Sequence, residues 1–143
     1  MSAAFKVQPI GPDDLARLER VDARMAIDPG RRRHIGELLT YGLSWSALRK
    51  GELVGFALVT RHFYALPFVD LLVVAETERR RGAGSALMAH CAAVHDADRI
   101  FTSTNESNAP MRALLAKAAW LPAGVVHYLD PGDPELIFVK LRV

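Results

Sequence analysis

The sequence is short of several features that mark particular classes of protein. A single cysteine, Cys91, excludes an internal disulfide and a cysteine-based metal cluster. No apolar run reaches the roughly 20 residues that a membrane-spanning helix needs, and Met1–Lys6 lacks the apolar stretch of a signal peptide. The formal net charge of +2 is too small to indicate a nucleic-acid partner. We therefore expect a soluble cytoplasmic protein with no membrane and no nucleic acid among its partners.

Length and composition indicate one compact domain. The chain has 143 residues, of which half are hydrophobic and 24% are charged, as in ordinary globular proteins. A chain of this length can bury a substantial core. Neither an internal repeat nor a linker divides it, so we predict a single domain over residues 1–143.

Hydrophobic periodicity predicts a mixed sheet with helices packed on it. Strand patterns occur at Phe5–Ile10, Leu43–Arg49, Leu53–Phe63, Phe68–Val74, Arg99–Thr104, Val125–Leu129 and Leu136–Leu141. Helical spacing occurs at residues 15–21, 31–41, 83–94 and after Asn108. Short turns favour antiparallel pairing, whereas the strands flanking the 83–94 helix should be parallel. The prediction is an α/β (α+β) fold: a mixed, mostly antiparallel sheet of six to seven strands with about four helices.

The segment from Phe68 to Met88 has the character of an anion site. An apolar strand runs into a glycine-containing turn, and the turn opens a helix. Gly82 and Gly84 remove side chains where a ligand could approach the backbone. Backbone amides at a helix N-terminus favour an anion, and neighbouring arginines add positive charge. The pattern predicts a cradle for a diphosphate.

Three phosphate-binding motifs compete for this turn. The P-loop needs a Gly-Lys pair followed by Ser or Thr, and that lysine is absent. The dinucleotide fingerprint needs a third glycine near Met88, where there is none. The remaining pattern, Arg/Gln-x-x-Gly-x-Gly/Ala, is met by Arg79, Gly82 and Gly84.

With that motif the sequence resembles the GNAT acetyltransferase superfamily. Asn108 opens a helix and Trp120 stands near its end, as an asparagine and an aromatic residue do in the family. The resemblance extends along nearly the whole chain and is closest from Phe68 to Gly124. It implies the GNAT fold and an acetyl-CoA-dependent N-acetyltransferase. Such an enzyme transfers an acetyl group to a primary amine of a small molecule, peptide or protein by direct attack.

The resemblance also implies a cofactor site. The strand backbone at Leu72, Val73 and Val74 would pair with the pantetheine arm of acetyl-CoA. The diphosphate would lie on the loop formed by Arg79, Arg80, Arg81, Gly82, Ala83, Gly84 and Ser85. Asn108 would contact the cofactor from the next helix.

Two positions depart from the family pattern. Leu115 stands where many relatives have a tyrosine that can protonate the leaving thiolate, and Ser103 stands where some have a glutamate base. These departures raise an alternative function, a catalytically weakened module that binds acetyl-CoA or CoA as a sensor or scaffold.

Asp70 is the first candidate for the catalytic base. A carboxylate in the middle of an apolar strand is costly unless something justifies it. By the two-residue period, Asp70 should share a face with Leu72 and Val74. Burial would raise its pKa toward a useful range. The structural alternative is a carboxylate paired with a backbone amide or with Arg61.

Other polar residues are weaker candidates. His62 and His127 could serve as bases, since imidazole titrates near neutral pH, but each is an ordinary strand histidine. Glu106 could be a base, although a favourable charge near a helix start is the preferred interpretation, and Tyr128 is a weak candidate acid. Cys91 lies on a helical apolar stripe and is expected in the core. No cluster with metal-ligand spacing occurs, so we expect no metal.

The acceptor and the oligomeric state are less defined. Arg31–Arg33 could favour an acidic acceptor, whereas Asp130, Asp133 and Glu135 could attract a cationic amine, so the sequence leaves the acceptor open. The apolar stretch Ile137–Val139 could lie at a sheet edge and pair with a second copy, which would make a homodimer.

Overall fold

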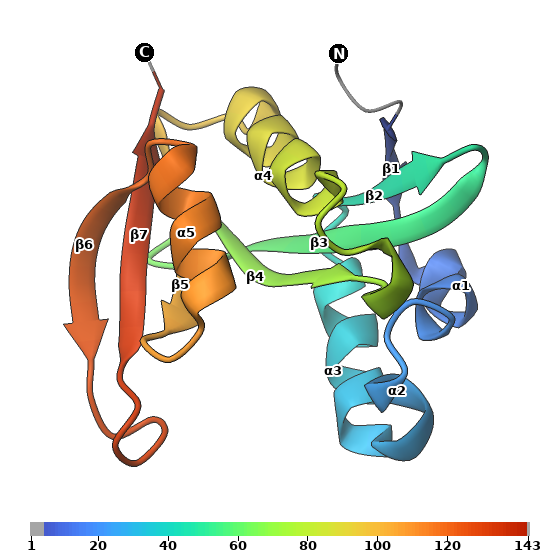
Figure 1. Ribbon diagram of the computed structural model, residues 1–143, viewed down its shortest axis with the longest axis horizontal. Helices are drawn as coiled ribbons and strands as arrows, with labels where there is room; N and C mark the ends of the chain where they lie inside the picture. The colour runs from blue at the N-terminus through green and yellow to red at the C-terminus, as the bar shows by residue number, and fades with distance from the viewer. Residues whose placement is uncertain (1–4, 143) are drawn as a thin grey trace.

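The computed structural model describes residues 5–142. Its strands are β1 (Phe5–Ile10), β2 (Ser44–Arg49), β3 (Glu52–Phe63), β4 (Leu66–Val74), β5 (Arg99–Asn105), β6 (Leu121–Val126) and β7 (Glu135–Leu141). Its helices are α1 (Leu15–Glu19), α2 (Arg24–Ile27), α3 (Pro29–Leu39), α4 (Ala83–Val94) and α5 (Ala109–Lys117), with 3₁₀ turns η1 (Pro12–Asp14) and η2 (Glu76–Glu78). The seven strands form one sheet in the order β1-β2-β3-β4-β5-β7-β6 (Figure 1).

The sheet is mixed because one pair of neighbouring strands is parallel. All neighbouring strands pair antiparallel except β4 and β5, which are joined through α4 and pair parallel. The β2–β3 turn uses left-handed backbone at Lys50 (φ 53°) and Gly51 (φ 82°), the geometry that suits a tight hairpin. The predicted mixed, mostly antiparallel sheet is confirmed.

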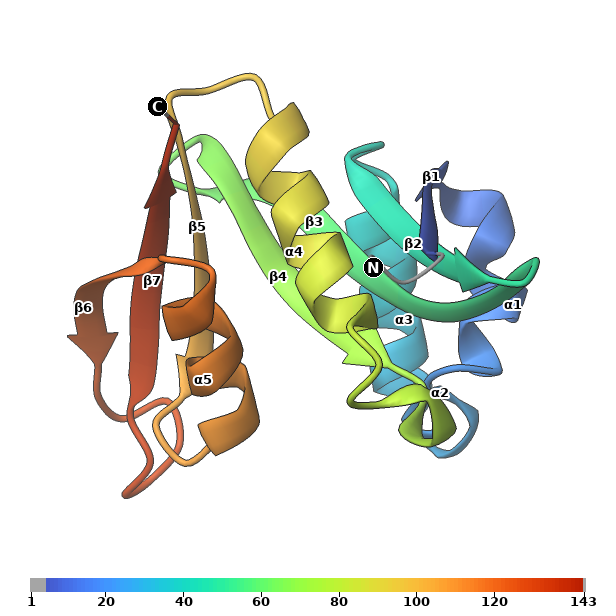
Figure 2. The same cartoon turned by 45° about the horizontal axis from the view of Figure 1, so that its top comes forward.

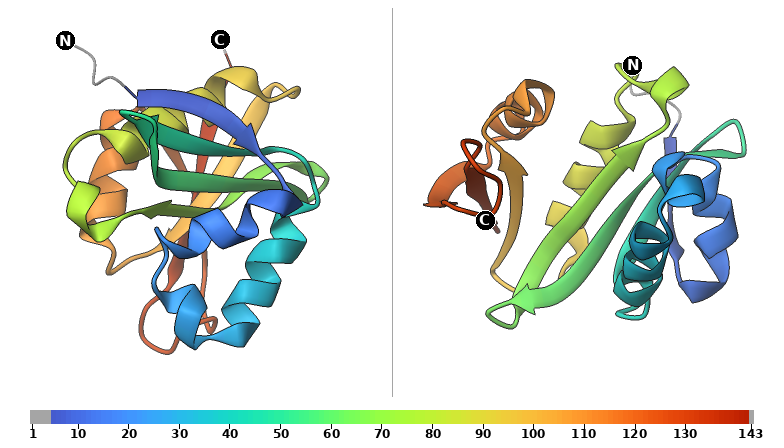
Figure 3. Two further views of the ribbon diagram at one scale, coloured as in Figure 1. Left: turned by 90° about the vertical axis from the view of Figure 1, so that its right-hand side faces the viewer. Right: turned by 90° about the horizontal axis from the view of Figure 1, so that it is seen from below.

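Helices cover both faces of the sheet, and each face has its own core (Figure 3). On one face, α4 and α5 pack on the sheet through buried residues such as Leu87, Met88 and Leu115. On the other, α1 to α3 bury Leu18 and Ile35 with their neighbours against β3. We call these the α4 face and the α3 face.

The sheet opens between its two central strands (Figure 2). Within the described residues, β4 and β5 pair at two positions, Phe68 with Phe101 and Val69 with Thr102. The buried Thr102 hydroxyl donates to the Val69 carbonyl across 2.9 Å at the last pair. Beyond it the strands diverge, and the half-buried stretch of β4 from Leu71 to Val74 pairs with β3 alone.

A β-bulge falls at the point of divergence. On β3 the neighbours Leu58 and Val59 pair with Leu71 and Val69, so Asp70 is an extra residue in β4. An extra residue reverses the alternation of side chains. The expectation that Asp70 shares a face with Leu72 and Val74 is therefore wrong. Leu72 and Val74 pack on the α4 face, whereas Asp70 bonds to Thr60 on the α3 face.

The last two strands differ from the sequence prediction. The strand expected at Val125–Leu129 is β6 at Leu121–Val126, an exposed edge strand whose burial does not alternate. The stretch Ile137–Val139 lies in β7, which is paired on both sides, by β5 and by β6. The sheet edges are β1 and β6, so β7 offers no free edge for a homodimer.

No helix within residues 5–142 is both long enough and apolar enough to cross a membrane.

Leu115 gives a test of the α4-face core. Its side chain is fully buried between α5 and the sheet. We expect Leu115→Ala to lower the free energy of unfolding by about 2–5 kcal/mol, through lost burial and a cavity. Lys117→Ala, exposed on the same helix, is the control and should change stability little. Urea denaturation followed by circular dichroism measures both, and equal stability of the two variants would contradict the packing.

Candidate active site

The glycine turn after β4 forms a helix N-terminus directed at solvent. The chain passes through η2 and reaches Gly82, the N-cap residue of α4, at φ 97°. The first helical hydrogen bond runs from the Ala86 amide to the Gly82 carbonyl. The amides from Gly82 to Ser85 therefore belong to the open first turn, where the helix dipole favours an anion. Gly82 supplies a backbone conformation that other residues adopt at a cost.

Gly84 has a packing role that the sequence did not indicate. A Cβ at this position would lie 3.2 Å from Leu114 Cδ1 of α5 and 3.6 Å from Leu72 Cδ2 of β4. The glycine thus lets α4 approach α5 and β4 closely. A side chain here would meet these apolar neighbours before it met a ligand on the amides.

An ion pair holds the approach to the turn. Arg49 at the end of β2 makes two 2.8 Å hydrogen bonds to the Glu78 carboxylate in η2. The guanidinium lowers the pKa of the Glu78 carboxyl. Next along the chain, Arg79, Arg80 and Arg81 are exposed around the open turn of α4. The bound Glu78 carboxylate is thus followed directly in sequence by three exposed arginines, which lead into the first turn of α4.

Asn108 and Leu115 have defined positions on α5. The Asn108 side chain accepts a hydrogen bond from the Met111 amide at 3.2 Å, which confirms it as the helix cap. Leu115 and Trp120 are buried in the α4-face core. A leucine there offers no proton to a leaving group.

Asp70 lies one residue beyond the last β4–β5 pair and is held by its neighbours. The Thr60 hydroxyl donates to Asp70 Oδ1 at 2.6 Å, and His62 Nδ1 lies 3.7 Å from Oδ2. Burial raises the pKa of the Asp70 carboxyl above its ordinary value. The Thr60 hydrogen bond and the charges of His62 and His34 oppose that rise. The alternative pairing with Arg61 is not made, because Arg61 turns to the α4 face and binds Asp96.

A histidine and a tyrosine extend this arrangement to the surface. His62 Nε2 is hydrogen-bonded to the Tyr41 hydroxyl, and the two rings meet edge to face with centroids 4.8 Å apart. Tyr41 comes from the turn after α3, His62 from the end of β3 and Asp70 from β4. Three segments therefore bring one titratable or hydroxyl-bearing side chain each to a continuous polar chain.

On β5 the position expected for a base carries Ser103, whose hydroxyl donates to Glu135 Oε2 of β7 at 2.7 Å. Two acidic residues of the 127–134 loop accept hydrogen bonds from the β5–α5 segment. Asp133 accepts from the amide and hydroxyl of Ser107, and Asp130 accepts from Asn105. These bonds fasten the loop to the β5–α5 turn.

Other candidates lie apart from Asp70. Arg31 binds the buried Asp22 and Arg32 binds Glu19, so these two arginines tie α3 to the preceding helices. His127 and Tyr128 follow β6 and are exposed. Cys91 is in the core as expected, and burial raises the pKa of its thiol to about 12, which keeps it protonated.

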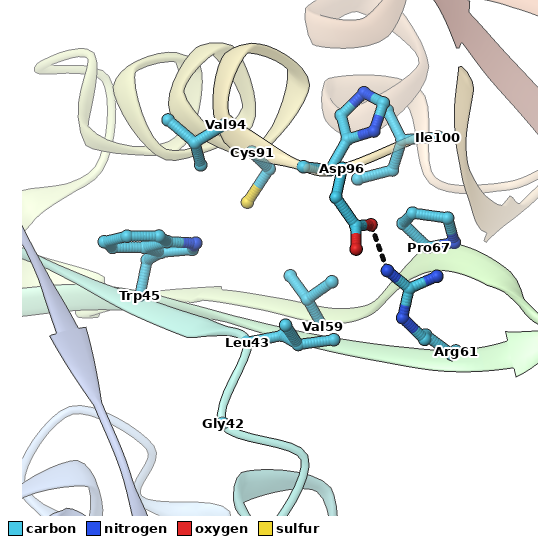
Figure 4. Close-up of a pocket in the computed structure, with 11 residues that line it drawn as sticks. Gly42, Leu43, Trp45, Val59, Arg61, Pro67, Cys91, Val94, Asp96 and Ile100 are labelled. Carbon is cyan, nitrogen blue, oxygen red and sulfur yellow. Dashed lines mark hydrogen bonds and ion pairs between the residues drawn. The ribbon is translucent and has the colours of Figure 1, made fainter. Parts of the chain in front are cut away.

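A pocket of about 170 Å³ lies on the α4 face of the sheet, beneath the C-terminal half of α4 (Figure 4). Trp45, Val59 and Cys91 form its apolar wall, and the Arg61–Asp96 ion pair lies at one side. It is separated from Asp70 by the sheet, so it does not belong to the same site.

The residues that the sequence assigned to acetyl-CoA fit such a ligand. A diphosphate needs donors and positive charge, which the open turn of α4 and its exposed arginines offer. A pantetheine amide chain needs backbone partners, and the stretch Asp70–Val74 has its β5 side free of strand pairing within the described residues. Both features lie on the same strand-turn-helix unit.

The chain belongs to the GNAT acetyltransferase family, whose model matches residues 13–120. It is similar to a GNAT-family acetyltransferase from Bacillus cereus, with 29% identity over 99% of both chains and a TM-score of 0.89. No curated protein sequence matches it significantly. The GNAT fold and the family resemblance are thus confirmed, and family membership indicates an acyltransferase.

More distant structures share the fold. The ribosomal-protein-S18-alanine N-acetyltransferase from Escherichia coli is 16% identical, with 96% and 93% of the two chains covered and a TM-score of 0.82. Diaminobutyrate acetyltransferase from Paenibacillus lautus, solved with L-2,4-diaminobutyric acid and coenzyme A, is 20% identical, with 96% and 95% covered and a TM-score of 0.72.

Sequence reasoning missed Thr60 and Tyr41 near Asp70, and the Arg49–Glu78 ion pair. In the sequence alone, these four residues cannot be told from ordinary polar residues of a strand or a surface. The missing signal was the bulge, which decides which β3 residues Asp70 meets.

The raised pKa of Asp70 predicts a pH-dependent stability effect. A folded-state pKa above the ordinary value near 3.8 means that the folded protein holds this proton more tightly than the unfolded chain. The favourable contribution is present at acid pH and is lost as pH rises through the folded-state pKa. Asp70→Asn removes this dependence while keeping an oxygen for Thr60. We therefore expect its Tm to equal or exceed that of the wild type at pH 8, with the difference shrinking toward pH 4.

Thermal denaturation followed across that pH range measures the effect. The exposed carboxylate variant Asp13→Asn serves as control and should show no such trend. A Tm of Asp70→Asn well below the wild type at pH 8 would mean that the charged carboxylate stabilises the fold.

Proposed function

We propose that this chain is an acetyl-CoA-dependent N-acetyltransferase that transfers the acetyl group to a primary amine by direct attack. The observation that carries the proposal is one of placement. The open turn of α4 and the unpaired side of β4 adjoin each other, and Asp70 stands where the strands begin to diverge. The proposed backbone partners of the pantetheine arm and the candidate base thus share β4, which leads into the open turn of α4.

In this proposal the binding residues are the ones assigned from the sequence. The amides of Gly82, Ala83, Gly84 and Ser85, with Arg79, Arg80 and Arg81, hold the diphosphate. The backbone of Leu72, Val73 and Val74 pairs with the pantetheine amides, and Asn108 contacts the ligand from α5. When bound, acetyl-CoA supplies an activated acetyl thioester.

The reaction also needs a group that removes a proton from the amine, and it must release a thiolate. A protonated amine has no lone pair for attack, so Asp70 would accept the proton, directly or through a water. Its burial-raised pKa makes it a better base than an ordinary surface carboxylate. Leu115 cannot act as an acid. A thiol has an ordinary pKa of about 8.5, so a thiolate can leave near neutral pH without full protonation.

Two of the similar proteins have titles that state an amine-bearing acceptor. One is named for the alanine of a ribosomal protein, and another is solved with its diamino acid substrate. These names support an amine acceptor for this chain and leave open whether it is a polypeptide N-terminus or a small molecule.

The cofactor half is tested by Gly82→Val. A β-branched residue at φ 97° is strained and would distort the open turn. We expect calorimetry to show that Gly82→Val loses at least tenfold in affinity for acetyl-CoA. The wild type should bind both acetyl-CoA and CoA, and should bind ATP much more weakly. Gly132→Val is the matched control, since Gly132 also has positive φ (75°) but lies in the 127–134 loop. Unchanged affinity in Gly82→Val would remove the turn from the site.

The catalytic half is tested by Asp70→Asn. We expect turnover to fall by about 10²- to 10⁴-fold, the usual contribution of a general base, with acetyl-CoA affinity unchanged. Release of free CoA on a panel of peptide and small-molecule amines measures it. Full activity of the variant at neutral pH would exclude Asp70 as the base. Acetyl-CoA binding without turnover on any amine by the wild type would favour the sensor or scaffold alternative.

A further inference from the structure

We propose that His62 and Tyr41 form a proton exit for Asp70, carrying the proton taken from the acceptor amine to bulk water. The proposal rests on the proposed function, since it concerns the base of that reaction. It assigns positioning and relay roles to two residues outside the cofactor site.

The two oxygens of the Asp70 carboxylate have different neighbours: Oδ1 accepts a hydrogen bond from Thr60, and Oδ2 faces His62. Thr60 is fully buried, and its hydroxyl accepts from the His62 amide at 3.1 Å. With that bond made, its one proton is donated to Asp70 Oδ1 at 2.6 Å. A proton arriving at Asp70 is therefore expected on Oδ2, the oxygen nearest to His62 Nδ1.

His62 connects this buried oxygen to the surface. Its Nδ1 lies 3.7 Å from Oδ2, an ion-pair distance that must close to about 2.8 Å for proton transfer. Catalytic contacts are often this long before substrate binds. The ring is 53% exposed, and its Nε2 is bonded to the Tyr41 hydroxyl. One nitrogen thus faces the carboxylate while the other is held at the surface.

The proton balance closes over one cycle. The ammonium N–H bond breaks and the proton adds to Oδ2, leaving a neutral amine and a carboxylic acid. The acid then gives this proton to Nδ1 of neutral His62, which restores the carboxylate and leaves an imidazolium. The Nε2 proton of the imidazolium then passes to the Tyr41 hydroxyl as the Tyr41 proton passes to bulk water, which leaves His62 protonated on Nδ1. Exchange of ring protons with water at the exposed imidazole returns the proton to Nε2 before the next cycle. For Nδ1 to accept, neutral His62 must carry its proton on Nε2 and donate it to Tyr41.

Few other charged groups surround this chain of residues. From the α3 side, Tyr41 faces His62, and the charge of His34 acts on Asp70. From β4, Asp70 itself faces the ring. Arg61, the next residue on β3, is turned to the opposite face by Asp96. Within the described residues, Asp70 is therefore the carboxylate that the His62 ring faces.

The kinetic test replaces His62 by Ala and by Gln. We expect kcat to fall about ten- to a hundredfold in both, with the KM for acetyl-CoA unchanged. Added imidazole should restore part of the activity of His62→Ala in proportion to its neutral form. His62→Gln should move the acidic limb of the pH profile upward, because a positive ring lowers the pKa of Asp70. Tyr41→Phe should lower kcat less than either.

The exposed His127 supplies the matched control. His127→Ala should leave kcat and the pH profile unchanged. If kcat of the His62 variants stays within twofold of the wild type, or falls without any response to imidazole, the relay is overturned.

A second measurement needs no turnover and so separates this proposal from the proposed function. The ¹⁵N chemical shifts of His62 report its tautomer directly. We expect the Nε2–H tautomer in the neutral wild type, with Nδ1 free to accept from Asp70. An Nδ1–H tautomer in the neutral wild type would overturn the relay even if the enzyme proves active. The expected tautomer without any activity would instead place the failure in the proposed function.

Discussion

The parallel pairing of β4 with β5 ends at Val69 and Thr102, and the position of the whole candidate site follows from that ending. A central strand of a sheet ordinarily has both edges satisfied by its neighbours. Here the Thr102 hydroxyl takes the last carbonyl, and the following five residues of β4 keep one edge available. Since β4 leads directly into the open turn of α4, backbone donors for an extended chain and for an anion adjoin one another.

The bulge at Asp70 places neighbouring side chains of β4 on opposite faces of the sheet. Leu72 and Val74 return to the α4 face, where Gly84 lets the helix approach them closely. Asp70 stays on the α3 face with Thr60 and His62. Because one extra residue sends these side chains to opposite faces, the proposed cofactor site and the proposed base can lie on one strand without competing for space.

The elements that the sequence predicted well are those set by local rules. β1 at Phe5–Ile10 and the hairpin at Lys50–Gly51 depend on period and turn chemistry, and the Asn108 cap depends on one side chain. β6 was misplaced because an exposed edge strand shows no alternation of burial to detect. The position of β7 inside the sheet depends on its pairing with β5. The sequence pattern within β7 does not encode this long-range pairing.

The sequence by itself determined the cradle motif from Arg79 to Ser85, the order of the elements and the family, because each is carried by residues close together along the chain. Only the tertiary structure decided which groups surround Asp70. Thr60 and His62 reach it from β3, and Tyr41 joins His62 from the turn after α3. A single bulge sets the face on which these groups meet. The physical reason is that a strand's side-chain direction depends on its residue-by-residue register with a neighbour, and one inserted residue reverses that direction without leaving a signal in the composition.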